Sequence, residues 1–243
     1  MKSLLIALQF LTVLPVKIKG EIEDADFGRA LAYFPFIGLL IGLVLAGCYS
    51  FLGFLPELVR LALVLIISMI ASGGMHLDGF ADSCDGFYAG RSKEKILEIM
   101  RDPHVGTMGI IGIFSILLLK FSILVSVPKA MILQLLIAMP VFSRCVQVIS
   151  CYFGYARQEG KARNFISQAH PVQLLVSLIF TFSVLTLLFG VNGILLATVS
   201  LLPALIFIAF VKRKISGMTG DTIGAASEIA EVSMLFFALI ILG

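Results

Sequence analysis

The sequence is poor in charged residues and contains no tryptophan. Only 14% of its 243 residues are aspartate, glutamate, lysine or arginine, whereas soluble domains carry about 25%, so the composition excludes an ordinary water-soluble globular protein. Without tryptophan, tyrosine and phenylalanine must supply the aromatic residues at any membrane–water interface. The chain also lacks a basic tail and any basic patch interleaved with aromatic residues, and we therefore expect no nucleic-acid partner.

The four cysteines show no paired spacing, and the common catalytic signatures are missing. The cysteines lie in or beside apolar segments, which predicts reduced packing residues rather than disulfides. No serine, cysteine or histidine triad signature and no Walker-type phosphate loop can be recognised. The sequence therefore gives acyl transfer little support.

Long apolar runs take the place of the missing charge. Hydrophobic residues make up 59% of the chain and the mean hydropathy is +1.06, as expected for helices that cross a bilayer. We predict an all-α, polytopic integral membrane helical bundle that forms a single membrane-embedded catalytic domain over residues 1–243. About six full transmembrane helices are expected, at 30–56, 60–72, 109–127, 131–152 and, on either side of a turn at 191–193, within 171–211.

Shorter apolar helices are expected at the N- and C-terminal ends of the chain. Residues 3–16 have the composition of a signal peptide but lack a small-x-small cleavage site, so a short half-inserted or core helix is the preferred interpretation. The apolar part of 60–72 is short for about 30 Å of hydrocarbon. We therefore expect this span to continue as a helix into the acidic stretch that follows and to emerge from the bilayer there.

The polar loops predict how the chain is oriented. Four segments carry most of the 18 lysines and arginines, and the paired spans place all four on one side of the membrane: 17–29, 75–108, 153–170 and 212–228. The positive-inside rule assigns that side to the cytoplasm. We expect a multi-pass protein of the cytoplasmic (inner) membrane whose active site faces the cytoplasm.

Three aspartates fall close together in the stretch 72–109. Asp78, Asp82 and Asp85 are spaced i, i+4 and i+7, which places them on one face of a helix. Carboxylates that close repel one another, and a hard divalent cation relieves the conflict. We therefore predict that these three residues bind Mg²⁺ or Mn²⁺, with Mg²⁺ as the cofactor. The alternative is a solvated acidic patch on a loop.

A second acidic group follows near the C-terminus and contains Asp221, Glu228 and Glu231. We expect residues 217–231 to form a helix that packs against the 78–90 helix, with Gly79, Gly86 and Gly224 allowing close approach. Three carboxylates are candidate catalytic proton acceptors: Asp85, Asp221 and Glu228. The alternative is that Asp221 or Thr219 caps a helix and that the glutamates are interfacial.

Arginines near these acids are candidate ligands for a pyrophosphate, because a guanidinium binds phosphate oxygens in a bidentate manner. The predicted substrate-binding residues are Arg29, Arg91, Arg101, Asp102, Arg144 and Arg157. Arg144 is the most informative of them because it sits within an apolar segment, where an ionisable group usually faces a polar cavity. For Arg91 and Arg157 the alternative is simple positive-inside anchoring.

Several motifs together resemble the adenosylcobinamide-GDP ribazoletransferase (cobalamin synthase) family. The resemblance covers nearly the whole chain, and its most specific part is GGMHLDGFADSCDGFYAGRSKEKILEIMRDPHVGTMG at 73–109. Five further pieces occur in the same order: FLTVLPV at 10–16, the Phe34-Pro35 and Gly38 region, SRCVQVI at 143–149, YARQEGKA at 155–162 and GMTGDTIGAASEIAE at 217–231. The family pattern has proline where YARQEG has glutamine, which is a mild departure.

The resemblance implies a Mg²⁺-dependent enzyme of the cytoplasmic membrane. Its substrates would be adenosylcobinamide-GDP and α-ribazole or α-ribazole 5′-phosphate, and its products adenosylcobalamin or adenosylcobalamin 5′-phosphate with GMP. Besides the substrates, the lipid bilayer is an expected partner, and a homo-oligomer is left open.

Two other functions are kept as alternatives. The acidic motif is similar to that of CDP-alcohol phosphotransferases, which suggests a phospholipid synthase, although Asp82 stands where that family has arginine. A cation-coupled transporter is less favoured, because its carboxylates are expected within the spans, whereas the predicted topology places the acidic residues at helix ends.

Overall fold

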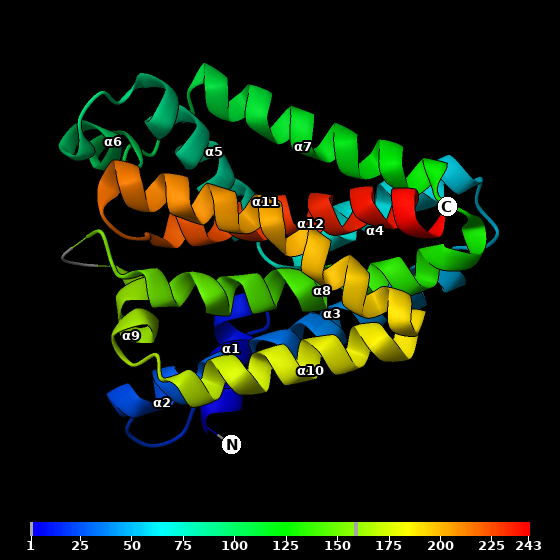
Figure 1. Cartoon of the computed structure of the whole chain (residues 1–243), viewed down its shortest axis with the longest axis horizontal. Coiled ribbons are helices and arrows are strands. Elements are labelled where there is room, and N and C mark those ends of the chain that lie inside the picture. The colour runs from blue at the N-terminus through cyan, green and yellow to red at the C-terminus, as the bar shows by residue number, and fades with distance from the viewer. Residues whose placement is uncertain (1, 158–159) are drawn as a thin grey trace.

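All regular secondary structure in the described part of the chain is helical, which confirms the all-α prediction. The computed structural model describes residues 2–157 and 160–243. The helices, shown in Figure 1, are α1 (Lys2–Leu11), α2 (Asp24–Leu31), α3 (Phe34–Phe51), α4 (Glu57–Ala71), α5 (Met75–Ala89), α6 (Lys93–Ile99), α7 (Thr107–Ser126), α8 (Lys129–Ser150), the short 3₁₀ helix η1 (Cys151–Phe153), α9 (Lys161–Ser167), α10 (Pro171–Phe189), α11 (Val191–Ile215) and α12 (Gly220–Leu242).

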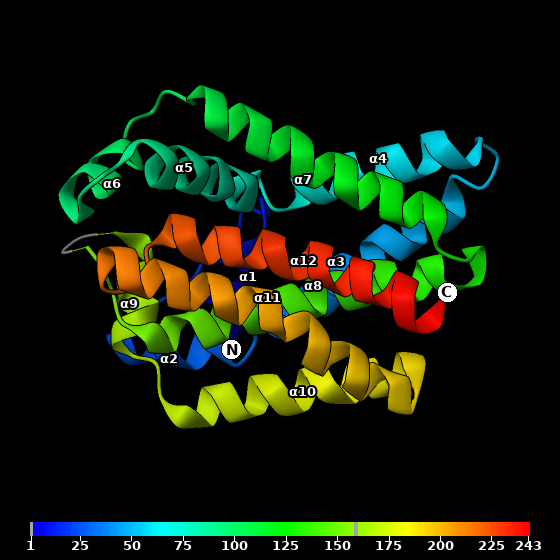
Figure 2. The same cartoon turned by 45° about the horizontal axis from the view of Figure 1, so that its top comes forward.

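Six of these helices are long and apolar enough to cross a membrane: α3, α7, α8, α10, α11 and α12. They run roughly along one axis, with α7 and α10 on opposite sides of the bundle and α8, α11 and α12 between them (Figures 1 and 2). Large apolar side chains on the outer helices, such as Phe114, Leu187 and Ile206, are exposed. No described residue covers these apolar surfaces, as expected for helices that face lipid.

The polar connections gather at one end of the bundle. In Figure 1 this end contains α2, α6, α9 and the loop before α12, whereas the short turns after α3, α7 and α10 lie at the other end. This grouping agrees with the predicted pairing of spans. The bundle therefore has one polar end at which residues far apart in the sequence can meet.

The sequence suggested a short C-terminal helix. In the structure this helix, α12, is one of the six long helices. Residues 220–231 and the apolar tail belong to one helix of 23 residues, α12 (Gly220–Leu242), and the first three residues of the predicted 217–231 helix precede it, with Thr219 as the N-cap. The Thr219 hydroxyl accepts a hydrogen bond from the backbone N–H of Thr222 at 3.1 Å, so Thr219 rather than Asp221 is the cap. Nothing interrupts the helical hydrogen bonds between the polar and apolar parts, and the helix continues across both.

The predicted continuation of the second span into the acidic stretch is also wrong. Helices α4 and α5 are separated at Ser72–Gly74 and meet at an angle of 86°. Gly73 and Gly74 have φ of 63° and 69°, a conformation that glycine adopts without steric cost. The end of α1 supports the bend, because Val13 N–H donates to the carbonyl oxygen of Ala71 at 3.0 Å. At 10 residues, α1 itself is short, as predicted.

Helices α8 and α12 form the buried centre. Helix α8 packs against α3, α10 and α12, while α12 also packs against α5, α7 and α11. The second acidic group is on α12, and α12 contacts α5, which carries the first. The two acidic segments of the sequence therefore lie side by side next to the buried centre.

Candidate functional site

The acidic face of α5 meets the first turn of α12. A Cβ atom added at Gly79 would lie 2.7 Å from the Cα of Asp221, so the two backbones touch where α5 has no side chain. Gly224 makes a similar approach to His76, whereas Gly86 faces Met100 and Ile96 instead of α12. The predicted packing of these two helices is therefore confirmed, with two of the three expected glycines at the contact.

This contact brings Asp78, Asp82 and Asp221 together; we call these three residues the acidic group. Asp82 interacts electrostatically with both of the others, and Asp221 interacts with Asp78. Two of the three aspartates come from α5 and one from α12, so the helix packing assembles a cluster that neither helix has alone. The mutual repulsion favours a bound cation in this position.

Among the described residues, Arg157 forms an ion pair with the acidic group. Its guanidinium lies 2.8 Å from Asp221 Oδ2, and its side chain is 12% exposed. Two backbone hydrogen bonds hold this segment beside the residues that precede α12: Ala156 N–H donates to Met218 and Met218 N–H donates to Gly154. These bonds explain how a residue in a polar loop reaches the start of α12.

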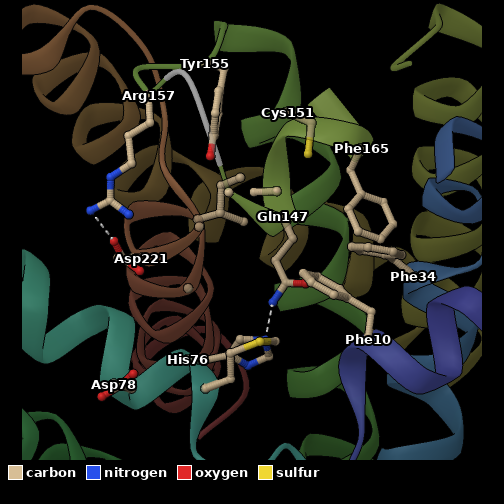
Figure 3. Close-up of a pocket in the computed structure, with 16 residues that line it drawn as sticks. Phe10, Phe34, His76, Asp78, Gln147, Cys151, Tyr155, Arg157, Phe165 and Asp221 are labelled. Carbon is tan, nitrogen blue, oxygen red and sulfur yellow. Dashed lines mark hydrogen bonds and ion pairs between the residues drawn. The ribbon is translucent and has the colours of Figure 1, made fainter. Parts of the chain in front are cut away.

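A cavity of about 270 Å³ opens beside Arg157 and two members of the acidic group. One wall carries Asp78, Asp221 and Arg157, and the opposite wall carries the rings of Phe10, Phe34 and Phe165 (Figure 3). The phenylalanines come from α1, α3 and α9. We call them the aromatic wall. A cavity with charge on one side and aromatic rings on the other suits an amphipathic ligand.

Polar side chains lie between these two walls. The amide nitrogen of Gln147 lies 2.8 Å from Nε2 of His76 and donates to Ser227 Oγ at 2.9 Å. The amide oxygen of Gln147 finds no hydrogen-bond partner among the described residues, and the residue is 1% exposed. An unpaired buried acceptor is costly, so this oxygen is available to a donor in the cavity.

Asp85 interacts electrostatically with Asp82, but its carboxylate is bonded to the loop before α7. Its two carboxylate oxygens accept hydrogen bonds from the backbone N–H groups of Gly106, at 2.7 Å, and Gly109, at 2.9 Å. A carboxylate at the N-terminus of a helix satisfies N–H groups that the helix leaves unpaired. Asp85 thus fixes the start of α7 against α5.

Glu228 and Arg144 belong to a second, fully buried cluster, which we call the charge network: Lys120, Arg144, Glu228 and Glu231. Lys120 donates to both glutamates at 2.6 Å, and Arg144 donates to Glu231 at 2.7 Å. The two cations balance the two carboxylates, as burial in an apolar bundle requires.

The charge network corrects the expectation that the acidic residues all lie at helix ends. Glu231 lies near the middle of α12, and Lys120 lies within α7. The space beside the network is only about 10 Å³, so it offers no open path for an ion. His76 lines both this space and the larger cavity and therefore separates the charge network from the acidic group.

The remaining predicted substrate-binding residues lie outside the cavity. Arg29 lines a different groove, with Lys2 and Gln173, and its guanidinium is 3.5 Å from Asp26. Arg91, Arg101 and Asp102 are exposed. Asp102 accepts hydrogen bonds from His104, and Arg101 interacts electrostatically with Tyr155, which lines the cavity.

The aromatic wall and Tyr155 were not predicted from the sequence. Burial raises the pKa of Tyr155, with Arg157 and Arg101 opposing the shift, so its phenol stays protonated near neutral pH. Phe10 opens the FLTVLPV segment, but phenylalanine occurs throughout the apolar segments, and no pattern in the sequence joins Phe10 to Phe34 and Phe165. Tyr155 had one signal, because it opens the YARQEGKA segment that also contains Arg157.

The acidic group fits a hard divalent cation by the chemistry of its donors. Three carboxylates with one paired arginine supply anionic oxygen ligands, which Mg²⁺ prefers. Within residues 2–157 and 160–243, no three histidine, cysteine, aspartate or glutamate side chains are already gathered closely enough to form a metal site. Cation binding therefore requires the aspartate side chains to turn toward one another.

Comparisons with known proteins give one consistent result. A family model described as cobalamin-5-phosphate synthase matches residues 3–239. The chain is 36% identical over 246 residues to a protein of Clostridium novyi (strain NT) named adenosylcobinamide-GDP ribazoletransferase, covering 98% of this chain and 97% of that protein.

Other relatives carry the same name. One from Geotalea daltonii is 38% identical over 232 residues, covering 95% of this chain and 94% of the relative. Another, from Clostridium acetobutylicum, is 36% identical over 239 residues, covering 96% and 94%. No solved structure matches the chain.

Proposed function

The chain belongs to the cobalamin-5-phosphate synthase family, a family of transferases that act late in cobalamin biosynthesis, and we propose that it is an adenosylcobinamide-GDP ribazoletransferase. It joins adenosylcobinamide-GDP to α-ribazole, or to α-ribazole 5′-phosphate, and releases GMP. The observation that supports this proposal best is the cavity in which Arg157, Asp78 and Asp221 share one wall.

Arg157 is suited to bind the pyrophosphate of the activated corrinoid. Its guanidinium is already held at the cavity wall by Asp221, and an arginine can release a carboxylate and bind phosphate oxygens in a bidentate manner. The exchange frees Asp221. The N-terminus of α12, at Gly220, also lines the cavity and favours an anion nearby.

Asp78 and Asp82 are the residues proposed to hold Mg²⁺ in this site. Both lie on one face of α5, and the charge of Asp82 is opposed by its acidic neighbours. When bound, Mg²⁺ would supply positive charge that offsets the pyrophosphate and the leaving GMP.

Asp221 is the proposed general base. Of the three predicted proton acceptors it is the one that lines the cavity, because Asp85 is bonded to two backbone N–H groups and Glu228 to Lys120. The ribose hydroxyl oxygen bonds to the phosphorus nearest the corrinoid. The bond from that phosphorus to the bridging oxygen breaks, GMP leaves with that oxygen, and Asp221 accepts the hydroxyl proton.

The proposed location is the cytoplasmic membrane, with the cavity facing the cytoplasm. The polar end of the bundle contains the loops richest in lysine and arginine, and such loops stay on the cytoplasmic side. The cavity lies at this end, since Tyr155, Arg157 and Gly220 all line it.

Purified protein tests this function directly. Incubation with adenosylcobinamide-GDP, α-ribazole and Mg²⁺ should release GMP and form the joined corrinoid. Omitting α-ribazole is the matched control and should abolish GMP release. Turnover of CDP-diacylglycerol with no activity on the corrinoid would instead identify a phospholipid synthase.

A further inference from the structure

The cavity has a second wall whose chemistry the proposed reaction does not use. Phe10 and Phe165 have ring centroids 4.6 Å apart, and Phe34 lies 5.5 Å from Phe165 and 6.0 Å from Phe10. The rings come from three separate helices and form one continuous apolar surface. That surface faces Asp221 and Arg157 across the cavity (Figure 3).

The size of the cavity limits which part of either substrate can bind inside it. Ligand pockets usually measure from about 300 to 1,000 Å³, so a cavity of about 270 Å³ accepts a group of nucleoside size. A corrin macrocycle with its side chains is much larger and must stay outside. Two nucleosides remain as candidates for the aromatic wall, the α-ribazole acceptor and the guanosine of the donor.

The lining favours α-ribazole. Its base is a benzimidazole with two methyl groups, which is flat and largely apolar, with one ring-nitrogen acceptor and no N–H donors. Guanine carries several donors and acceptors, and the aromatic wall provides no partner for them, so its burial there leaves polar groups unpaired. Aromatic rings and methyl groups match the wall through area and offset stacking.

The polar side of the cavity matches the sugar. Gln147 lines the cavity, and its amide oxygen has no partner in the described part of the chain. A ribose hydroxyl supplies the missing donor. With the base against the aromatic wall, the sugar lies between Gln147 and Asp221, which is where the proposed transfer needs a hydroxyl.

We propose that Phe10, Phe34 and Phe165 bind the base of α-ribazole and determine which nucleoside the enzyme accepts, with Gln147 binding its ribose. This inference rests on the proposed function for the identity of the acceptor. It assigns the aromatic wall as a specificity site.

Two variants test the wall in opposite ways. Phe10→Leu removes ring surface from a partly buried position. Ala162→Leu places a larger side chain in the cavity from α9 and so reduces the space for a ligand. Both variants should weaken binding of α-ribazole by at least about tenfold, because a single methylene in an apolar pocket changes binding by about that factor. Equilibrium dialysis without the second substrate measures this binding. Phe36→Leu is the matched control, since Phe36 packs against Phe180 outside the cavity.

Kinetics and competition complete the test. The KM for α-ribazole should rise in both variants, the KM for adenosylcobinamide-GDP should stay unchanged in Phe10→Leu, and guanosine should not displace α-ribazole. Displacement by guanosine, or a rise confined to the KM of the corrinoid, would overturn the proposal. If the protein releases no GMP but still binds α-ribazole through this wall, the proposed function fails and the site stands. If it releases GMP and neither variant weakens α-ribazole binding, the site fails alone.

Discussion

Asp221 and Glu228 lie two turns apart on α12, and their neighbours give them different chemistry. Asp221 faces Arg157 and the cavity, whereas Glu228 is 5% exposed and bonded to Lys120. In the same way, Arg157 lines the cavity, whereas Arg144 is buried and paired with Glu231. At the scale of single residues, the identity of the partner therefore decides which charges remain available to a ligand.

Asp82→Asn should lower turnover by at least about a hundredfold if the acidic group holds a metal ion that contributes several kcal/mol. The substitution nearly keeps the shape of the side chain and reduces the repulsion within the acidic group, so the protein should remain folded. Rates of GMP release at several Mg²⁺ concentrations measure the effect. Asp24→Asn, at an exposed position on α2, should retain full activity. Near-normal turnover of Asp82→Asn with unchanged Mg²⁺ dependence would remove the acidic group from the mechanism.

At the scale of helices, the site depends on how closely α5 and α12 approach. Their contact at Gly79 and Asp221 leaves no room for a side chain. The bend at Gly73 and Gly74 directs α5 toward α12, and the charge network joins α12 to α7 and α8 through Lys120 and Arg144. The positions of the proposed catalytic carboxylates are therefore set by backbone packing and buried ion pairs together.

Gly79→Ala should separate α5 from α12 and reduce activity strongly, because the new Cβ would lie 2.7 Å from Asp221 Cα and backbone atoms must move to relieve the clash. The kcat for GMP release and the thermal stability of the purified protein are the measurements. Gly47→Ala is a matched control, since a Cβ at Gly47 on α3 would meet nothing within 4 Å. An active, stable Gly79→Ala protein would show that the approach of these helices is not needed.

Lys120→Met should destabilise the protein by about 3–5 kcal/mol, the cost of leaving buried carboxylates without their partner. Thermal unfolding in detergent measures the loss. The double variant Lys120→Met, Glu228→Gln should recover part of it, because the carboxylate of Glu228, which loses its Lys120 partner, is then replaced by a neutral amide. Lys129→Met alters an exposed lysine, with 78% of its side chain accessible, and should have little effect. A wild-type melting temperature for Lys120→Met would contradict the stabilising role of the network.

At the scale of the whole molecule, the bundle separates an apolar lipid-facing surface from one polar end. The cavity lies at that end and is built from α1, α3, α5, α8, α9, α12 and the segment after α8. Because these parts of the chain are far apart in the sequence, the site exists only when the full bundle is assembled. A substrate from the aqueous side can reach the cavity without crossing the membrane.

Reporter fusions test this orientation. Fusions at Pro56, Lys129 and Asn192 should report the outside, and fusions at positions 92, 160 and 215 should report the cytoplasm, because loops rich in lysine and arginine are retained inside. Activity of paired cytoplasmic and periplasmic reporters is the measurement. A cytoplasmic signal at Asn192 would contradict the pairing of α10 with α11.

The sequence by itself determined the helical membrane fold, the grouping of the polar loops and the residues of the α5–α12 contact. Hydropathy and charge are local properties that accumulate along the chain, and glycine next to aspartate at helical spacing already indicates a close approach. The sequence could not show whether Asp85, Arg144 and Glu228 bind a ligand or pair with other residues of the protein. The one-dimensional pattern does not contain the hydrogen-bond partner of a carboxylate or guanidinium.

Only the tertiary structure decided which charges pair with one another. The charge network joins residues 108 and 111 positions apart, the aromatic wall joins α1, α3 and α9, and the break between α4 and α5 depends on support from α1. Each of these is a long-range contact, and its energy comes from burial that a linear pattern does not contain. Hydropathy and charge along the sequence therefore predicted the fold. Packing determined which charged residues line the cavity and which form buried ion pairs.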